Sequence, residues 1–388
     1  MSLNVSLKKR LGLVYLSGFL FAVHLALITY VNSSLLKQFV GDNTLNILYI
    51  GGSLLSIVFL LLAPSILRKS GSVLTFLFFI TLEIFAIFGM ASTNVAALVI
   101  ILFLIHIATS SMLYFCIDIN LEQETKIEGE TGGKRSILLT ISNFAWVLSP
   151  LTLVFLVTQN TFGKVYLLSA VALIPLFIIV SIFFKNTKTA PIINTRIFST
   201  LRSLWNKKDQ AKIIGTQFIL NFFYAWMVIY LPLLLNKEIG FGWDKIGLIF
   251  TIMLLPFILF EMPTGFLADK KFGEKEFLIL GFIIMFISTI FIPTLHSPVF
   301  WIWTVLLFVT RVGASLVEAS SESYFFKHVK EEDTGFISLF RMARPLSYVI
   351  APLFALPVVY FFSYSSSFYF LACFTLLGLL FIPKRDTK

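Results

Sequence analysis

Charged side chains are scarce in this chain, and its few cysteines are placed where they can do little chemistry. Of 388 residues, 58% are hydrophobic and only 13% are charged, a composition far outside the range of soluble globular proteins. The two cysteines, Cys116 and Cys373, both lie in apolar runs, so they cannot form a disulfide framework or a zinc site by themselves. The sequence therefore predicts no cofactor and no metal site.

Motifs for nucleotide-driven chemistry are also missing. The chain has no Walker loop, no glycine-rich dinucleotide fingerprint and no cluster of zinc ligands along the sequence, which disfavours ATP-driven transport by this chain alone. His328 and Asp333 stand at the spacing seen in lipid acyltransferases. That spacing arises easily by chance, and no soluble domain surrounds the pair to bind an acyl donor. We therefore expect no enzyme, and keep a membrane-embedded lipid-modifying enzyme as a weak alternative.

Long apolar runs fill most of the sequence. Each is about 20 residues long, enough for a helix rising about 1.5 Å per residue to cross a hydrocarbon core of about 30 Å. Segments such as 98–105 and 278–286 are apolar on every face, which indicates helices and not the alternating strands of a barrel. The predicted spans are 11–31, 44–65, 73–91, 95–118, 136–158, 164–184, 213–235, 246–267, 277–294, 299–321, 336–361 and 365–383. We predict an all-α polytopic membrane protein with 12 transmembrane helices.

Lysine and arginine alternate from loop to loop. With the N-terminus placed inside, only Lys37, Lys164, Lys237 and Lys245 fall in outer loops, as the positive-inside rule requires. The formal net charge of +10 then lies beside anionic lipid headgroups and requires no nucleic acid. Both termini are expected in the cytoplasm, and the short loops favour a prokaryotic plasma membrane.

The longest polar break divides the chain near its middle. It predicts an N-terminal six-helix bundle at 1–184, a cytoplasmic linker at 185–212 and a C-terminal six-helix bundle at 213–388. Within the linker, apolar residues recur every fourth position from Ile193 to Trp205, which is typical of an amphipathic helix on a membrane surface. A solvated tether is the alternative.

The two halves repeat one another in places. Residues 131–151 parallel residues 334–353, and Pro64 and Pro263 end corresponding spans. Repeats of six spans are typical of transporters whose two halves rock around a site at the membrane midplane.

The most specific local signal is the inner loop at 261–276, which reads EMPTGFLADKKFGEKE. It resembles the signature loop of the major facilitator superfamily, which joins the second and third helices of a six-helix repeat. The residues that carry the resemblance are Gly265, Asp269, Lys270, Gly273 and Lys275. Glu274 stands where the superfamily usually has a basic residue.

The resemblance implies a major facilitator fold of two pseudo-symmetric bundles and a role for this loop. In the superfamily the loop contacts the opposite half, which here is the start of the fifth span at Arg135. Breaking that contact as the halves rock implies a conformational latch made by Gly265, Asp269, Lys270, Gly273 and Arg135.

Polar side chains at mid-membrane depth are the candidates for function, because each is costly there unless it is paired or hydrated. In the superfamily, the first, fourth, seventh and tenth spans line a central cavity. The resemblance thus implies a substrate cavity lined by His24, His106, Asn221, Tyr224, Arg311 and Glu318. Glu83 and Glu261 are the candidates for proton coupling.

Arg311 is the sharpest of these candidates, because its side chain is always charged and stands near the middle of its span. It needs either a counter-ion or an anionic ligand, and Glu318 lies two turns away on the same face. A structural pair is as well supported as substrate binding. For His24, His106 and Glu83, a hydrogen-bonded buried group is the competing interpretation.

We therefore predict a secondary transporter of a small solute that works by alternating access and is driven by an ion or solute gradient, with protons as one candidate for a coupling ion that the sequence leaves open. Its expected partners are the solute, protons and membrane lipids, and no nucleic acid. A non-transporting receptor or scaffold is the main alternative. Substrate and direction are left open by the sequence.

Overall fold

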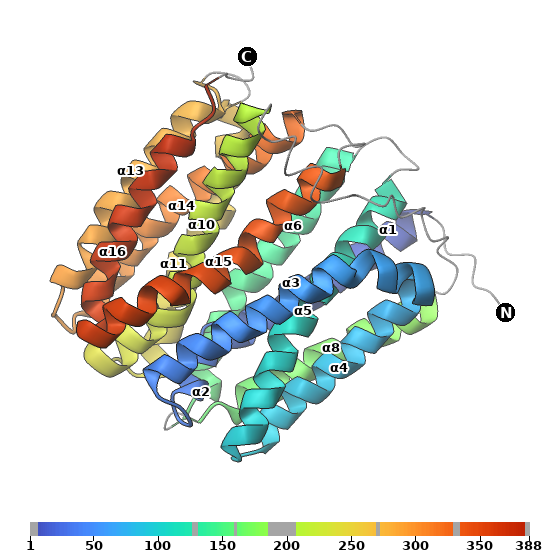
Figure 1. Ribbon diagram of the computed structural model, residues 1–388, viewed down its shortest axis with the longest axis horizontal. Coiled ribbons are helices and arrows are strands. Elements are labelled where there is room, and N and C mark those ends of the chain that lie inside the picture. The colour runs from blue at the N-terminus through green and yellow to red at the C-terminus, as the bar shows by residue number, and fades with distance from the viewer. Residues whose placement is uncertain are drawn as a thin grey trace. The chain divides into compact units, whose positions relative to one another are not determined.

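The computed structural model describes residues 7–125, 131–158, 161–184, 207–268, 272–328 and 334–384. Within these ranges the chain is overwhelmingly helical (Figure 1). It divides into two compact units, Met1–Ile192 and Ile193–Lys388. Residues 185–206 of the predicted linker, with the predicted amphipathic helix, lie outside the described residues.

The first unit contains helices for each of the first six predicted spans. They are α1 (Leu7–Thr29), α3 (Asp42–Ser70), α4 (Ser72–Ser92), α5 (Ala96–Thr125), α6 (Thr131–Leu148) and α8 (Gly163–Phe183). A short helix, α2 (Asn32–Leu36), follows α1. Helix α4 packs against α5 and α8, and α1 contacts α6 and α8. A single residue, Gly71, joins α3 to α4 at a φ of +77°, a conformation that glycine adopts without strain.

The fifth predicted span is interrupted. Helix α6 gives way to a 3₁₀ turn, η1 (Ser149–Thr152), and then to α7 (Leu153–Leu156). Pro150 has no N–H to continue the α-helical ladder, which explains why the regular helix stops there. The uniform apolar character of the span concealed this break from the sequence.

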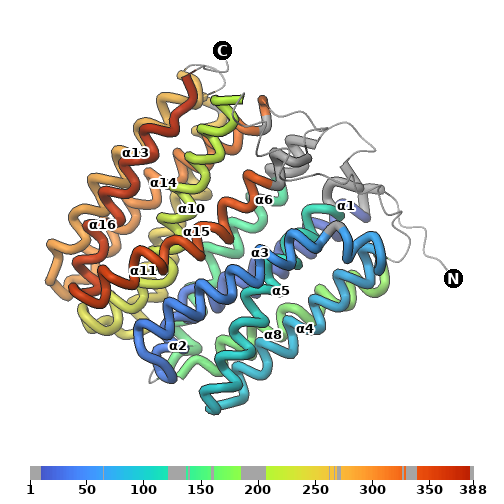
Figure 2. The backbone as a smooth tube through the Cα atoms, viewed as in Figure 1, coloured from blue at the N-terminus to red at the C-terminus, as the bar shows by residue number. Residues whose placement is uncertain are grey.

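The second unit contains helices for the other six predicted spans. They are α10 (Lys208–Leu233), α11 (Trp243–Leu259), α12 (Glu261–Leu267), α13 (Glu274–Ile290), α14 (Phe300–His328), α15 (Thr334–Phe361) and α16 (Tyr364–Leu376). Short helical turns follow α10, α13 and α16, namely η2 (Leu234–Glu238), η4 (Ile292–Thr294) and η5 (Leu377–Phe381). Helix α13 packs against α14 and α16, and α10 packs against α14 and α15, as the tube in Figure 2 also shows. The eighth predicted span consists of α11 and α12, because Pro263 cannot donate a hydrogen bond back to Leu259.

The helices have the length and composition of membrane spans. Among the described residues, 11 helices are long and apolar enough to cross a membrane, and the segment Thr140–Leu156 is a shorter apolar helix. This confirms the predicted all-α membrane fold. The short segment corresponds to the interrupted fifth span.

Both faces of a typical span are apolar. In α4, Phe76, Phe79 and Ile80 are buried, whereas Phe78 and Phe85 are more than half exposed. A helix that is apolar all round is expected where one side meets other helices and the other side meets lipid.

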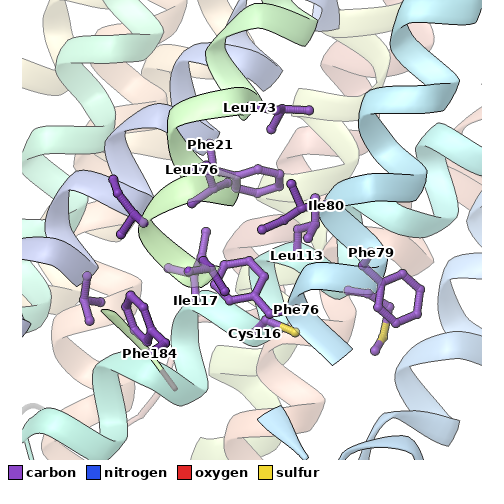
Figure 3. Packing of buried hydrophobic residues seen from close by; sticks show 14 of the residues in the cluster. Phe21, Phe76, Phe79, Ile80, Leu113, Cys116, Ile117, Leu173, Leu176 and Phe184 are labelled. Atoms are coloured by element: carbon purple, nitrogen blue, oxygen red, sulfur yellow. The ribbon is translucent and has the colours of Figure 1, made fainter. Parts of the chain in front are cut away.

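The core of the first unit lies about one helical turn from the buried polar residues His24, Glu83, Thr109 and Ser169. Phe21 of α1, Ile80 of α4, and Leu113 of α5 belong to this core, together with Leu173 and Leu176 of α8 (Figure 3). Each of the four helices therefore carries a polar group about one turn from an apolar anchor. Close packing of these anchors fixes the helix positions to which the polar groups are attached.

Candidate functional site

Three of the predicted residues meet inside the first unit. His24 Nε2 of α1 lies 2.8 Å from Glu83 Oε1 of α4, and His106 Nδ1 of α5 lies 2.5 Å from the same oxygen. All three side chains are buried, with relative exposures of 0%, 0% and 2% for His24, Glu83 and His106. One carboxylate oxygen is thus enclosed by two imidazoles. We call these three residues the histidine–glutamate cluster.

Two hydroxyl groups complete this cluster. Ser169 of α8 donates to the backbone carbonyl oxygen of His24 at 2.9 Å, and its Oγ lies 2.7 Å from His24 Nδ1. Thr109, one turn beyond His106, donates to Glu83 Oε2. Every functional atom of Glu83 and both ring nitrogens of His24 therefore have partners from the protein.

The hydrogen bonds determine where the His24 protons lie. The Ser169 hydroxyl has one proton, and because it goes to the carbonyl oxygen, Oγ must accept from His24 Nδ1–H. A further proton must then lie between His24 Nε2 and Glu83 Oε1, carried either by the imidazole or by the carboxyl group. A carboxylate in these apolar surroundings would be costly without such a partner.

Aromatic rings border the cluster. The ring of Phe21 stacks on His24 with centroids 5.8 Å apart, and the rings of His24 and His106 meet edge to face at 6.0 Å. Phe103 lies 6.3 Å from His106. The cluster is therefore a small group of polar side chains surrounded by the apolar side chains of the bundle.

A second polar group lies in the second unit around Arg311 of α14. Arg311 is 1% exposed, and its guanidinium lies 5.2 Å from the ring centroid of Phe223 and 5.8 Å from that of Tyr224. Among the described residues, its Nε and Nη1 have no hydrogen-bond partner. A permanently charged group is therefore buried with two unused donors.

Glu318 has a different partner from the one its spacing suggests. The Tyr224 hydroxyl donates to Glu318 Oε2 at 2.6 Å, and no ion pair joins Glu318 to Arg311 among the described side chains. Glu318 still interacts electrostatically with Arg311 and Arg344. The direct Arg311–Glu318 pair that the sequence allowed is not formed.

The remaining predicted residues of this unit lie along α10 and α12. Asn221 is buried and donates to the Gln217 backbone oxygen at 2.8 Å, and Ser321 donates to Gln217 Oε1 at 3.0 Å. Glu261 begins α12 and interacts electrostatically with Tyr224. Polar side chains thus follow the α10–α14 contact. His24 and His106 belong to one unit, and the other four predicted cavity residues belong to the other.

Comparisons with known proteins identify the architecture. The family model described as Major Facilitator Superfamily matches residues 213–388. A solved structure of the nucleoside transporter NupG has a TM-score of 0.73 at 12% identity, covering 97% of this chain and 98% of that chain. A transporter of the POT family, in complex with a thioalcohol-conjugated peptide, has a TM-score of 0.75 at 12% identity, covering 96% and 95%.

The family match covers the second unit, and the solved structures share the fold of nearly the whole chain. The human organic anion transporter MFSD10 (TETRAN) is also similar in structure, with a TM-score of 0.66 at 13% identity, covering 98% of this chain and all of that one. No curated protein matches the chain in sequence. The apolar helices and the shared fold support an integral membrane protein with the architecture of these transporters.

The superfamily loop is partly described. Gly265 lies in α12, and Gly273 has a φ of +97° immediately before α13. Asp269 and Lys270 lie outside the described residues, and so does the side chain of Arg135. The predicted latch therefore stays a prediction.

A residue of this loop that the sequence interpretation passed over has a clear role. Glu274, which stands where the superfamily usually has a basic residue, is 0% exposed and accepts from Lys327 Nζ at 2.5 Å and from Ser323 Oγ at 3.0 Å. The pair joins the first turn of α13 to the last turn of α14. Opposite charges at the same membrane level of two packed helices were the sequence signal for it.

Proposed function

We propose that this protein is a secondary transporter that carries a small solute with an anionic group, and that Arg311 binds this group. The observation that carries the proposal is the buried guanidinium with unpaired Nε and Nη1. A buried donor left unpaired costs about 1–3 kcal/mol. An arginine kept in this state is best explained by a ligand that completes its hydrogen bonds.

The surroundings of Arg311 favour an anion with oxygen acceptors. Nε and Nη1 lie on different edges of the guanidinium, so their N–H groups point in different directions and each can donate to a different acceptor oxygen of a bound anion. The rings of Phe223 and Tyr224 hold the guanidinium by cation–π contact. The nearby Glu318 accepts from Tyr224, and among the described side chains it forms no ion pair with Arg311.

The names of the similar transporters do not indicate one solute class. One is named for nucleosides, one holds a peptide conjugate and one is named for organic anions. The choice of an anion here rests on Arg311.

Alternating access is the mechanism that the division into two units supports. We assign the bundles to 1–184 and 213–388, with 185–212 as a cytoplasmic linker, both termini in the cytoplasm and a prokaryotic plasma membrane as the location. Proton coupling through Glu83 or Glu261 stays a prediction. Uptake of the identified solute into proteoliposomes with and without an imposed pH gradient tests it.

Ligand-dependent thermal stability tests the anion site. The purified protein is heated with a panel of carboxylates, phosphates, amines and neutral solutes, and a ligand at 100 times its Kd raises the unfolding free energy by about 2.7 kcal/mol. We expect stabilisation by anions in the parent and in Arg68→Gln, an exposed arginine, and none in Arg311→Gln. Equal stabilisation of Arg311→Gln, or hits restricted to amines or neutral solutes, would overturn the proposal. Transport of the hits into proteoliposomes then tests the function itself.

A further inference from the structure

We propose that the histidine–glutamate cluster of the first unit binds one divalent transition-metal ion, with Zn²⁺ as the test ion. The proposal goes beyond anion transport and concerns residues of the other unit. The sequence predicted no metal site, because His24, Glu83 and His106 stand on three separate helices. Only the folded chain brings them together.

The ligand atoms suit such an ion. His24 Nε2, His106 Nδ1 and one Glu83 carboxylate oxygen all lie within 4.8 Å of one another. Two imidazoles and one carboxylate are ligands that Zn²⁺ and other first-row divalent ions accept. Mg²⁺ and Ca²⁺ prefer oxygen ligands only, so the cluster discriminates against them.

The present distances are those of hydrogen bonds, and a small expansion converts them into ligand distances. Ligands at about 2.0–2.2 Å from a tetrahedral Zn²⁺ lie about 3.3–3.6 Å from one another. The two nitrogens lie 2.8 Å and 2.5 Å from Glu83 Oε1. A movement of less than about 1 Å between imidazole and carboxylate therefore accommodates the ion in place of the shared protons.

The supporting hydrogen bonds are those that a metal-binding histidine requires. Metal-bound histidines usually donate their second ring N–H to a protein acceptor, which fixes the tautomer. Here His24 Nδ1–H points to Ser169 Oγ, which in turn donates to the His24 carbonyl oxygen, so Nε2 is the nitrogen left for the ion. Thr109 holds the other oxygen of Glu83. The imidazole of His24 and the carboxylate of Glu83 are thus each oriented by a neighbouring hydroxyl group.

Three protein ligands leave a tetrahedral ion one further position. Structural zinc sites are closed by four protein ligands, whereas sites that exchange a ligand keep one position open. The ligands come from α1, α4 and α5 and the supporting Ser169 from α8. An ion bound here would join these helices, which predicts higher thermal stability of the metal-bound protein.

Calorimetric titration of the purified protein with Zn²⁺ tests the proposal. The protein carries an affinity tag without histidine and is freed of metal with a chelator. We expect one Zn²⁺ per chain, with protons released on binding because the ion displaces those between Glu83 and the imidazoles. Repeating the titration in two buffers of different ionisation enthalpy measures this release.

Matched variants locate the binding. The two other histidines of the chain, His296 and His328, are both exposed, so the double variant His296→Gln/His328→Gln is expected to bind Zn²⁺ like the parent. Glu83→Gln is expected to lose at least about 100-fold in affinity, and Ser169→Ala, which keeps every ligand, about 10–100-fold.

The outcomes are distinct. The proposal is overturned if the parent binds no Zn²⁺ at micromolar free ion. It is also overturned if His296→Gln/His328→Gln loses the binding. In either case the cluster holds protons only. Unchanged affinity in a folded Ser169→Ala overturns it as well. If Glu83→Gln does not fold, the visible absorption of Co²⁺ bound to the parent and to Ser169→Ala reports whether the ion has nitrogen and oxygen ligands. Arg311→Gln is expected to bind Zn²⁺ normally, so failure of the anion proposal does not affect this test.

Discussion

Replacement of Arg311 by methionine should make the ligand-free protein more stable. Methionine is unbranched and shorter than arginine, and it keeps an apolar stem in contact with the same helices. The substitution removes a buried charge whose Nε and Nη1 have no partner among the described residues. A residue kept for a ligand is expected to reduce the stability of the protein without that ligand.

The magnitude follows from the contacts of Arg311. Two unpaired buried donors cost about 1–3 kcal/mol each. Their removal is offset by lost cation–π contact with Phe223 and Tyr224, about 0.5–2 kcal/mol, of which a sulfur–aromatic contact restores about 0.3–1.5 kcal/mol. Glu318 loses some electrostatic compensation but keeps the hydrogen bond from Tyr224. We expect a net gain of about 1–3 kcal/mol, in line with replacements of other buried charges by apolar residues.

The assay is thermal unfolding of the ligand-free protein in detergent. For a domain of this size, about 1 kcal/mol corresponds to a Tm change of about 2–4 °C. Arg311→Met should therefore unfold several degrees above the parent, while Arg68→Met, at an exposed position, should change stability by no more than about 0.5 kcal/mol.

Loss of stability in Arg311→Met would contradict this prediction. If Arg311→Met lowers stability by more than about 1 kcal/mol and the double variant Arg311→Met/Glu318→Gln restores it, then Arg311 is one half of a structural ion pair. The case for an anion at Arg311 would then fail.

Two further predictions concern packing in the second unit. Glu274→Gln should destabilise the protein by about 1–2 kcal/mol, because the half-exposed Lys327 loses a charged partner but stays in contact with solvent, and a double-mutant cycle with Lys327→Met measures the coupling of the pair. Gly281→Ala should lower the Tm, because the added carbon would lie 2.7 Å from the Gly313 carbonyl oxygen and would force α13 away from α14. Gly12→Ala is its control, since no atom lies within 4 Å of a carbon added there, and it should be neutral or stabilising by up to about 1 kcal/mol. A Gly281→Ala protein as stable as the parent would contradict the close α13–α14 packing.

The spans were predictable because length and apolarity alone determine a membrane helix. Some ends agree closely, as at α4, predicted at 73–91 and found at Ser72–Ser92, whereas α14 continues to His328, past the predicted end at residue 321. What the pattern could not reveal is the rotation of each helix about its axis. In α4, Phe78 faces outward and Phe79 inward, yet both are phenylalanine.

The candidate site was predictable as a set of residues but not as an arrangement. His24, Glu83 and His106 were each expected to have a functional or structural role, because a polar side chain inside a membrane span is costly unless it is paired or hydrated. The sequence assigned the histidines to a cavity and Glu83 to coupling, since residues 59 and 23 positions apart carry no sign of contact. The partner of Glu318 was hidden for the same reason, because Tyr224 stands on another helix.

The two polar groups differ in one respect that decides what each can bind. In the histidine–glutamate cluster, the carboxylate of Glu83 is saturated with hydrogen bonds, so a ligand can enter only by displacing protons, and a cation does so. At Arg311, donors are left over, so a ligand enters by adding acceptors, and an anion does so. The charge of the expected ligand therefore follows in each case from the state of the hydrogen bonds and not from the residue types alone. If the hydrogen-bonding groups of the cluster had been left unpaired, or if every donor of Arg311 had been paired, neither proposal would have been supported.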